Sequence, residues 1–218
     1  MRLTVSIALL ALTLSTGCRS SVWSTSIQGE GPHLSLERPI EEFDAISLEG
    51  GWTLDVRVGE MTSVEIQADE NLHEYIATDV EDGRLRIHFL ESVSTSNPLR
   101  AVISTPHLHR LSIAGSGKLN VTGVAAQDFS ISIAGSGKGS ISGHTERLDV
   151  SIAGSGNLEL YELEADDVSI DIAGSGSVQT NARRSLDVDI AGSGRVRYHG
   201  QPEVSVSQSG SGSVRQGD

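Results

Sequence analysis

Five copies of the tetrapeptide Ala-Gly-Ser-Gly recur in the second half of this 218-residue chain. The copies begin at Ala114, Ala134, Ala153, Ala173 and Ala191, and a sixth, altered copy occupies residues 209–212. Successive copies are separated by 20, 19, 20, 18 and 18 residues. A nearly constant period of this length predicts a repeat architecture in which each repeat forms one stacked unit.

Apolar and polar residues alternate on both sides of each tetrapeptide, as in a β-strand with one buried face. The apolar positions before the copies are Leu111, Ile113, Phe129, Ile131, Ile133, Leu148, Val150, Ile152, Val168, Ile170, Ile172, Leu186, Val188 and Ile190. A repeat of 18–20 residues holds two or three short strands with their corners and is too short for a strand–helix–strand unit. The predicted fold is therefore an all-β solenoid with one repeat in each turn.

The two glycines of each tetrapeptide are predicted to turn the chain between strands, because glycine tolerates positive φ angles. These structural turn glycines are Gly115, Gly117, Gly135, Gly137, Gly154, Gly156, Gly174, Gly176, Gly192 and Gly194. An anion-binding nest of backbone N–H groups is the alternative, but the sequence has no Walker motif and no Gly-x-Gly-x-x-Gly. A catalytic serine is not expected here, because the serine recurs in every repeat whereas a nucleophile is needed once.

The N-terminus has the composition of a signal peptide. Arg2 supplies a positive charge, residues 3–14 are apolar, and small residues precede Cys18. The segment resembles a bacterial lipoprotein signal peptide, which implies cleavage after residue 17 and lipidation of Cys18; ordinary secretory cleavage is the alternative. Cys18 is the only cysteine, so no disulfide is expected. Arg19 follows instead of aspartate, which by resemblance to Gram-negative lipoproteins favours the outer membrane.

Residues 18–38 are rich in Ser, Gly and Pro and are predicted to form a flexible tether. Between residues 43 and 105 the alternation predicts several more strands. A short helical turn is expected at Asp69–Leu72 and a hairpin around Glu81–Gly83.

Three segments of this first part, together with the repeats, resemble a known family. Phe43–Ile46, Val64–Leu72, Val80–Ile87 and the later Ser-Ile-Ala-Gly-Ser-Gly repeats are similar to the head GIN domain of putative auto-transporter adhesins, a DUF2807-type family. The resemblance implies a right-handed, single-stranded, parallel β-helix over residues 39–218, with the repeats from 111 to 214. It implies no catalytic residues.

The charge balance argues against nucleic acid as a partner. The chain carries a net charge of −13, which becomes −14 once residues 1–17 with their single arginine are removed. Its only lysines are Lys118 and Lys138, and no basic patch with interleaved aromatic residues is present. Attachment to a membrane is therefore expected through the N-terminal lipid alone.

Acidic residues gather in two outward columns of the predicted solenoid. Asp171 and Asp189 occupy equivalent positions of neighbouring repeats, and Asp187 lies two residues before Asp189. Stacked carboxylates repel one another and require a cation, a basic neighbour or water. We expect a solvated face screened by Arg183 and Arg184, with no resident cofactor; calcium held by the three aspartates is the alternative.

Two further kinds of chemistry have candidate residues. β-Helical polysaccharide lyases resemble this architecture and use aspartates with calcium and an arginine base, for which Asp171, Asp189 and Arg184 are the candidates. The sequence has no long inserted loops to build the cleft that catalysis needs. His107 and His109 flank Leu108 and would share a strand face as metal ligands, but a third ligand is missing. Solvated corner residues are the better interpretation.

The sequence thus predicts a lipid-anchored envelope protein that is not an enzyme and that binds an envelope protein or a carbohydrate, in an adhesin-like role. A structural envelope lipoprotein without a ligand and a calcium-assisted lyase are the alternatives. Trp52, Tyr161 and Tyr198 are the aromatic candidates for an outward binding patch. The open end of the solenoid near Val214 makes self-association an expectation as well.

Overall fold

The computed structural model describes residues 26–217, so the predicted signal peptide and Cys18 lie outside the described residues. One 3-10 helix, η1 (Glu70–Tyr75), occurs in this range among many strands. No described helix has the length and the apolar run that crossing a membrane requires. In chain order the strands are β1 (Ile27–Gln28), β2 (His33–Arg38), β3 (Ala45–Glu49), β4 (Thr53–Val58), β5 (Ser63–Asp69), β6 (Ile76–Glu81), β7 (Arg84–Phe89), β8 (Val93–Ser94), β9 (Arg100–Thr105), β10 (Arg110–Gly115), β11 (Lys118–Gly135), β12 (Lys138–Gly154), β13 (Asn157–Gly174), β14 (Ser177–Gly192), β15 (Arg195–His199), β16 (Glu203–Gly210) and β17 (Ser213–Gln216).

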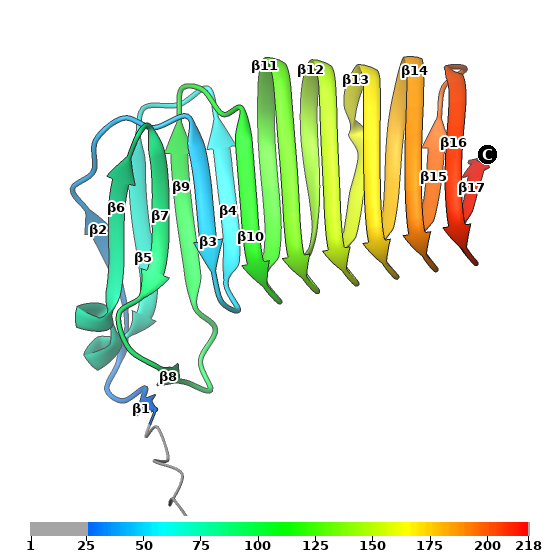
Figure 1. Cartoon of the computed structure of the whole chain (residues 1–218). Helices are drawn as coiled ribbons and strands as arrows, with labels where there is room; N and C mark the ends of the chain where they lie inside the picture. The colour runs from blue at the N-terminus through cyan, green and yellow to red at the C-terminus, as the bar shows by residue number, and fades with distance from the viewer. Residues whose placement is uncertain (1–25, 218) are drawn as a thin grey trace, which may run out of the picture.

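The strands from β10 onward stack into a solenoid (Figure 1). Each neighbouring pair from β10 to β14 is parallel, and the alanines of the five tetrapeptides are consecutive register partners. The strands descend on the near side of Figure 1 and return on the far side as the chain advances to the right, which is a right-handed coil. The predicted all-β, parallel solenoid is confirmed.

Each full turn of the solenoid is one long strand. The strands β11, β12, β13 and β14 contain 18, 17, 18 and 16 residues, and Gly-Ser-Gly separates each from the next. The second bend of the turn stays within the strand as an irregularity of register, for example between Val121 and Val124. The prediction of two or three separate short strands per repeat is therefore wrong, because β-bulges bend the strand while the pairing continues on both sides.

The Gly-Ser-Gly corner allows successive backbones to approach closely. Gly135 has a φ of 128°, and a Cβ atom there would overlap the carbonyl oxygen of Gly115 in the preceding turn. The backbone N–H of Ser136 donates to that same carbonyl oxygen at 2.9 Å. The second glycine faces the interior, where a Cβ on Gly194 would lie 2.8 Å from Cγ2 of Ile172. The first glycine is thus required by its backbone conformation and by space, and the second is required by space at Gly194.

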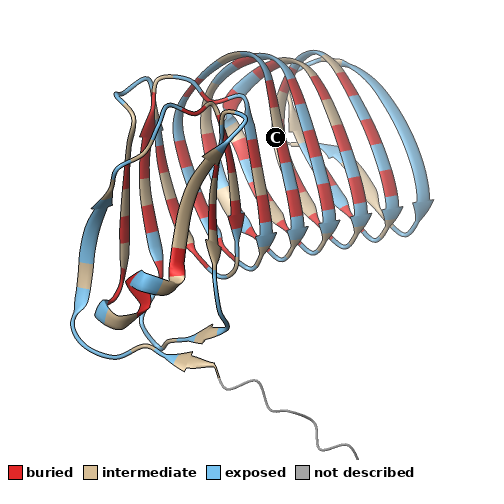
Figure 2. Cartoon of the chain, turned by 60° about the vertical axis from the view of Figure 1, so that its left-hand side comes forward, coloured by how far each residue is buried: buried red, intermediate tan, exposed pale blue. Residues whose placement is uncertain are grey.

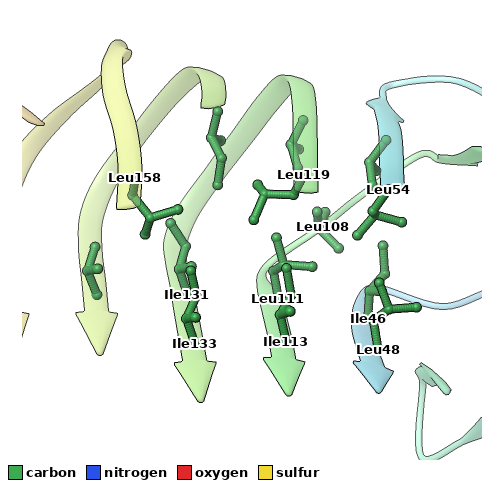
Figure 3. Packing of buried hydrophobic residues seen from close by; sticks show 14 of the residues in the cluster. Ile46, Leu48, Leu54, Leu108, Leu111, Ile113, Leu119, Ile131, Ile133 and Leu158 are labelled. Carbon is green, nitrogen blue, oxygen red and sulfur yellow. The ribbon is translucent and has the colours of Figure 1, made fainter. Parts of the chain in front are cut away.

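Ladders of aliphatic side chains fill the interior. Figure 3 shows Leu111 and Ile113 of β10 pointing inward beside Ile131 and Ile133 of β11. All four side chains are buried. Figure 2 shows the resulting alternation of buried and exposed residues along the inner turns. Full burial of one such side chain contributes about 1.5–3 kcal/mol, so stacking of turn on turn is the main source of stability.

Antiparallel strands close the N-terminal end of the solenoid. β2 pairs with β5, β5 with β9, and β6 with β7, all antiparallel. With η1 they form the left end of the molecule in Figure 1. The predicted hairpin is confirmed by the β6–β7 pair, and the predicted helical turn by η1 with its buried Leu72.

The folded region begins earlier than the sequence predicted. β2 lies within residues 18–38, and its six residues pair with Val64–Asp69 of β5. β1 lies within the same segment and pairs with β8. The prediction of a flexible tether is therefore wrong for residues 27–28 and 33–38, because backbone pairing to β8 and β5 orders a segment whose composition is that of a linker. Residues 18–25 of that segment lie outside the described residues.

Candidate functional site

The three aspartates of the acidic columns lie exposed on one face of the solenoid. Asp171 and Asp189 are register partners on β13 and β14, so their Cα atoms are about 4.8 Å apart. Arg183 does not screen them, because its guanidinium lies 3.8 Å from the carboxylate of Asp166. Asp187 also extends into solvent. The columns form a solvated face, and the predicted screening by arginine is wrong.

Arg184 is likewise engaged away from the columns. Its guanidinium donates two hydrogen bonds to the carboxylate of Asp167, one of them at 2.9 Å. Hydrogen bonds from Arg184 and Ser185 hold the pKa of Asp167 well below its usual range. Asp167 precedes Asp171 by four residues of extended chain, which is about 13 Å. The Asp171–Asp189–Arg184 arrangement that a lyase would require is therefore not assembled.

The two histidines do not share a strand face. His107 and His109 lie in the connection between β9 and β10, where both are exposed. Nδ1 of His109 lies 3.4 Å from a carboxylate oxygen of Asp44. Within residues 26–217, no three His, Cys, Asp or Glu side chains are placed to hold a metal ion.

The aromatic candidates separate into one buried residue and two partly exposed ones. Trp52 is 1% exposed, its indole N–H donates to the Glu49 carbonyl oxygen at 2.9 Å, and its ring stacks on Phe89. As an outward binding residue it is therefore a wrong prediction. Tyr161 and Tyr198 are half-buried at the surface.

The differences in repeat length are concentrated at the second bend of the solenoid, where Tyr161 lies. The β12–β13 pair shifts register between Ser140 and Gly143. The β13–β14 pair shifts between Leu160 and Glu164 and again between Ala165 and Asp167. Before and after these shifts the strands stay in register. The extra residues of β13 thus form a wide bulge. Bulges of this kind redirect side chains and are frequent beside functional sites.

A groove of about 350 Å³ lies along this bend. It crosses β11 to β14 and is lined by Asn120, Val121, Thr122, Ser140, Ile141, Ser142, Glu159, Tyr161, Glu162 and Gln179. Ser140 donates a hydrogen bond to the side-chain oxygen of Asn120 at 3.3 Å. Glu159, Glu162 and Gln179 also line the groove. The groove therefore offers hydroxyl, amide and carboxylate groups beside one aromatic ring.

The ring of Tyr161 is held in place by His199 of β15. The two rings are parallel within 4° and their centroids are 3.9 Å apart. This stacking covers one side of the tyrosine ring, while the residue also borders the groove. Tyr161 thus borders the groove with an aromatic ring of fixed orientation.

Tyr161 was predicted from the sequence as an aromatic binding candidate, but the groove that it lines was not predicted. The unequal spacing of the tetrapeptides indicates a bulge of this kind, because the extra residues of a longer turn can lie only where the strand pairing allows a bulge. The outward residues of the groove alternate as in any strand, so polarity alone did not distinguish them from a solvated face.

Comparison with known proteins decides the family. The family model described as "Putative auto-transporter adhesin, head GIN domain" matches residues 42–202. The chain belongs to this family. The resemblance inferred from the sequence is thereby confirmed, and the matched region extends from β3 to β15. No curated protein matches the chain.

Solved structures share the fold. A putative adhesin from Bacteroides fragilis NCTC 9343 is 21% identical, with a TM-score of 0.67, and 88% of this chain and 100% of that chain are covered. A putative lipid binding protein from Parabacteroides distasonis ATCC 8503 is 25% identical, with a TM-score of 0.55 and coverage of 89% and 100%. A putative adhesin from Parabacteroides merdae ATCC 43184 is 22% identical, with a TM-score of 0.53 and coverage of 88% and 99%.

Proposed function

We propose that this protein is an exported, lipid-anchored, adhesin-like binding protein that takes a saccharide in the groove beside Tyr161. The family description and the adhesin names of the structural neighbours support a role at the cell surface. The N-terminal sequence supports export and lipidation at Cys18, with the outer membrane as the destination.

The observation that carries the proposal is the composition of the groove. Saccharides present many hydroxyl groups, which both donate and accept hydrogen bonds, and apolar C–H faces that pack on aromatic rings. Tyr161 supplies a rigid ring, Glu159 and Glu162 supply strong acceptors, and Gln179 supplies both donor and acceptor. A volume of about 350 Å³ is at the lower end of the range for small-ligand sites. It suits one or two sugar residues.

The charge of the groove favours a neutral or amino sugar. Two of its side chains are carboxylates and none is cationic. An acidic polysaccharide would meet like charges there. This chemistry also argues against the lyase hypothesis, since a lyase of that kind acts on acidic polysaccharides.

The alternative functions predicted from the sequence require other structural features. A purely structural envelope lipoprotein does not require a groove. This hypothesis therefore does not account for the polar side chains that line the groove at the bulge. Lipid binding, which the name of the Parabacteroides distasonis protein suggests, requires an apolar cavity. The described interior of this solenoid is filled by its own side chains.

An oligosaccharide array tests the binding proposal. The full chain, kept in mild detergent, is expected to retain neutral or amino-sugar oligosaccharides and not acidic ones. Tyr161→Ala is expected to abolish retention, while Tyr161→Phe, which keeps the ring, retains most of it. Asp189→Asn on the solvated face is the matched control. Retention of no saccharide, or equal retention by Tyr161→Ala, would contradict the proposal.

Metabolic labelling with radioactive palmitate tests the anchor. The parent chain is expected to incorporate label and to sediment with membranes, and Cys18→Ser is expected to do neither. Label retained by Cys18→Ser would contradict lipidation at this residue.

A further inference from the structure

We propose that the C-terminal end of the solenoid binds a second copy of this chain, through antiparallel pairing of β16 with β16 of the partner. This inference goes beyond the groove and does not depend on saccharide binding. The two ends of the molecule differ in how far their edge strands are protected against pairing with another strand.

The turn formed by β16 and β17 keeps the pattern of the turns before it, but no further turn within residues 26–217 packs on it. Val204 and Val206 of β16 are register partners of Leu186 and Val188 of β14. They occupy the inward positions, yet they are 38% and 47% exposed. Every residue of β16 is exposed, and Figure 2 colours the strand pale blue along its length. The interior ladder therefore ends in open apolar side chains.

The backbone edge of β16 is open as well. β16 pairs with β14 on one side, and no strand within residues 26–217 pairs with the other side. An open edge recruits another strand unless lysine, proline or a bulge protects it. Glu203–Gly210 contains no lysine and no proline. Its only charged residue is Glu203 at the first position, so the edge is unprotected from Val204 to Gly210.

The opposite end of the molecule also has edge strands, but they are protected. There β2 pairs only with β5 and β6 only with β7 (Figure 1). Both edge strands carry charged residues, Glu37 and Arg38 in β2 and Asp79 and Glu81 in β6, and charged edge residues oppose pairing with another strand. Head-to-tail stacking, which would yield fibres, is therefore disfavoured. A second copy has the same unprotected β16 edge, so two C-terminal ends meet about a two-fold axis and the assembly closes as a dimer.

The side-chain pattern restricts the register of this pairing. Residues that lie opposite each other in an antiparallel pair point to the same face. The inward positions of the two copies coincide when the axis passes through a residue of β16. We place the axis at Val206, near the middle of Glu203–Gly210, where the pairing is long and Val206 faces its own copy; Val204 then faces Gln208 of the partner. Registers shifted by one residue would bring the apolar side of one strand to the polar side of the other.

Charge permits this arrangement. Glu203 is the only charged residue of β16. In the proposed register the two copies of Glu203 are separated by six residues, or about 20 Å. That distance exceeds the Debye length of about 8 Å at physiological salt, so the two charges do not oppose association.

Pairing at this end has a geometric consequence. The described N-terminus lies at the far left of Figure 1 and β16 at the far right. A dimer joined at β16 therefore holds its two N-termini at opposite ends of a doubled rod. If each N-terminus carries the proposed lipid, the dimer links two membranes, and the chain is a homotypic adhesin.

Single-cysteine crosslinking tests the pairing in the full chain with Cys18→Ser, kept in mild detergent. Val206→Cys is expected to form a disulfide-linked dimer, because paired Cα atoms lie about 4.5–5.5 Å apart, within disulfide reach. Val204→Cys alone is the matched control and is expected not to link, because its two copies are about 14 Å apart. Mixing Val204→Cys with Gln208→Cys is expected to restore the crosslink.

Sedimentation velocity supplies an independent readout. The chain is expected to sediment as a concentration-dependent dimer, and Val206→Glu to sediment as a monomer with an unchanged circular dichroism spectrum. Ser205→Glu, on the outward face of the same strand, is expected to remain dimeric. A monomeric parent chain, a dimer that survives Val206→Glu, or self-linking of Val204→Cys but not of Val206→Cys would overturn the proposal.

Discussion

Val188 of β14 and Val206 of β16 are register partners, yet Val188 is fully buried and Val206 is 47% exposed. Among the described residues, a further turn packs on Val188 and none packs on Val206. Stability in this fold therefore depends on position along the rod: an inner turn is covered on both sides, and the last described turn on one.

Alanine substitutions at these two positions measure that dependence. Val188→Ala is expected to lower the free energy of unfolding by about 2 kcal/mol, because it removes buried methyl groups and leaves a cavity. Val206→Ala is expected to cost well under half as much at concentrations where the chain is monomeric. Urea denaturation of both variants checks the difference. Equal losses of unfolding free energy in the two variants would show that Val206 is covered in solution even when the chain is monomeric.

The corner between strands yields a second prediction. Gly154 has a φ of 130°, and a Cβ there would overlap the carbonyl oxygen of Gly135. Gly154→Ala is therefore expected to destabilise the protein by about 3 kcal/mol or more. The neighbouring Ser155 is exposed, and Ser155→Ala is expected to change stability by less than about 0.5 kcal/mol.

Thermal denaturation of these two variants provides the measurement. A serine substitution as costly as the glycine substitution would mean that the serine ladder, and not the backbone approach, holds the corner.

The sequence predicted the solenoid because two independent patterns agreed. The period of the tetrapeptide gave the length of the turn, and the alternation around Ile133 or Ile152 gave the inward face. Both patterns are local and repeat many times, so no single exception obscures them.

The groove and the N-terminal closure were missed for opposite reasons. The bulge at Tyr161 exists only relative to neighbouring turns, so it is visible in register and not in composition. β2 is ordered by pairing with β5, for example at the register partners Ser35 and Gln67, which are far apart in sequence. Its Ser-, Gly- and Pro-rich surroundings indicated a linker, and tertiary pairing overrode that local signal. Arg184 was assigned to the acidic columns because it is near them in sequence, whereas register places it beside Asp167.

A buried carboxylate near the N-terminal end predicts sensitivity to acid. Asp69 is 1% exposed and accepts hydrogen bonds at 2.5 Å from Thr95 and from Asn97. These bonds lower its pKa. A carboxyl group with a depressed pKa in the folded state stabilises fully above its unfolded pKa, near 3.9, and the contribution is lost as the pH falls below that value. Stability is therefore expected to decline below about pH 4.

Asp69→Asn isolates this effect. The variant is expected to be less stable than the parent at pH 7, by about 1–3 kcal/mol, and to lose less stability between pH 4 and pH 2.5. Burial also lowers the pKa of His73, but protonation of that ring acts at higher pH, below its unfolded pKa of about 6.5. Urea denaturation across this pH range measures the free energy of unfolding of both proteins. A parallel decline of that free energy in the parent and in Asp69→Asn below pH 4 would contradict the role assigned to Asp69.

The solvated acidic face gives a prediction about calcium. Asp171 and Asp189 are like charges on adjacent strands, so Asp189→Asn is expected to stabilise the protein by about 0.3 kcal/mol at low salt. The gain is expected to vanish in 1 M sodium chloride, where the Debye length is about 3 Å. Melting curves with and without millimolar calcium complete the measurement. A calcium-specific stabilisation of the parent that Asp189→Asn loses would make the columns a metal site.

Calorimetric titration of the oligosaccharide selected on the array into the parent chain and Tyr161→Ala tests the binding site most directly. The groove predicts saturable one-to-one binding to each parent chain, weakened at least tenfold by Tyr161→Ala, roughly 1.4 kcal/mol. Asp189→Asn is expected to bind as the parent does. Equal affinity of the parent and Tyr161→Ala would contradict the assignment of the groove as the binding site.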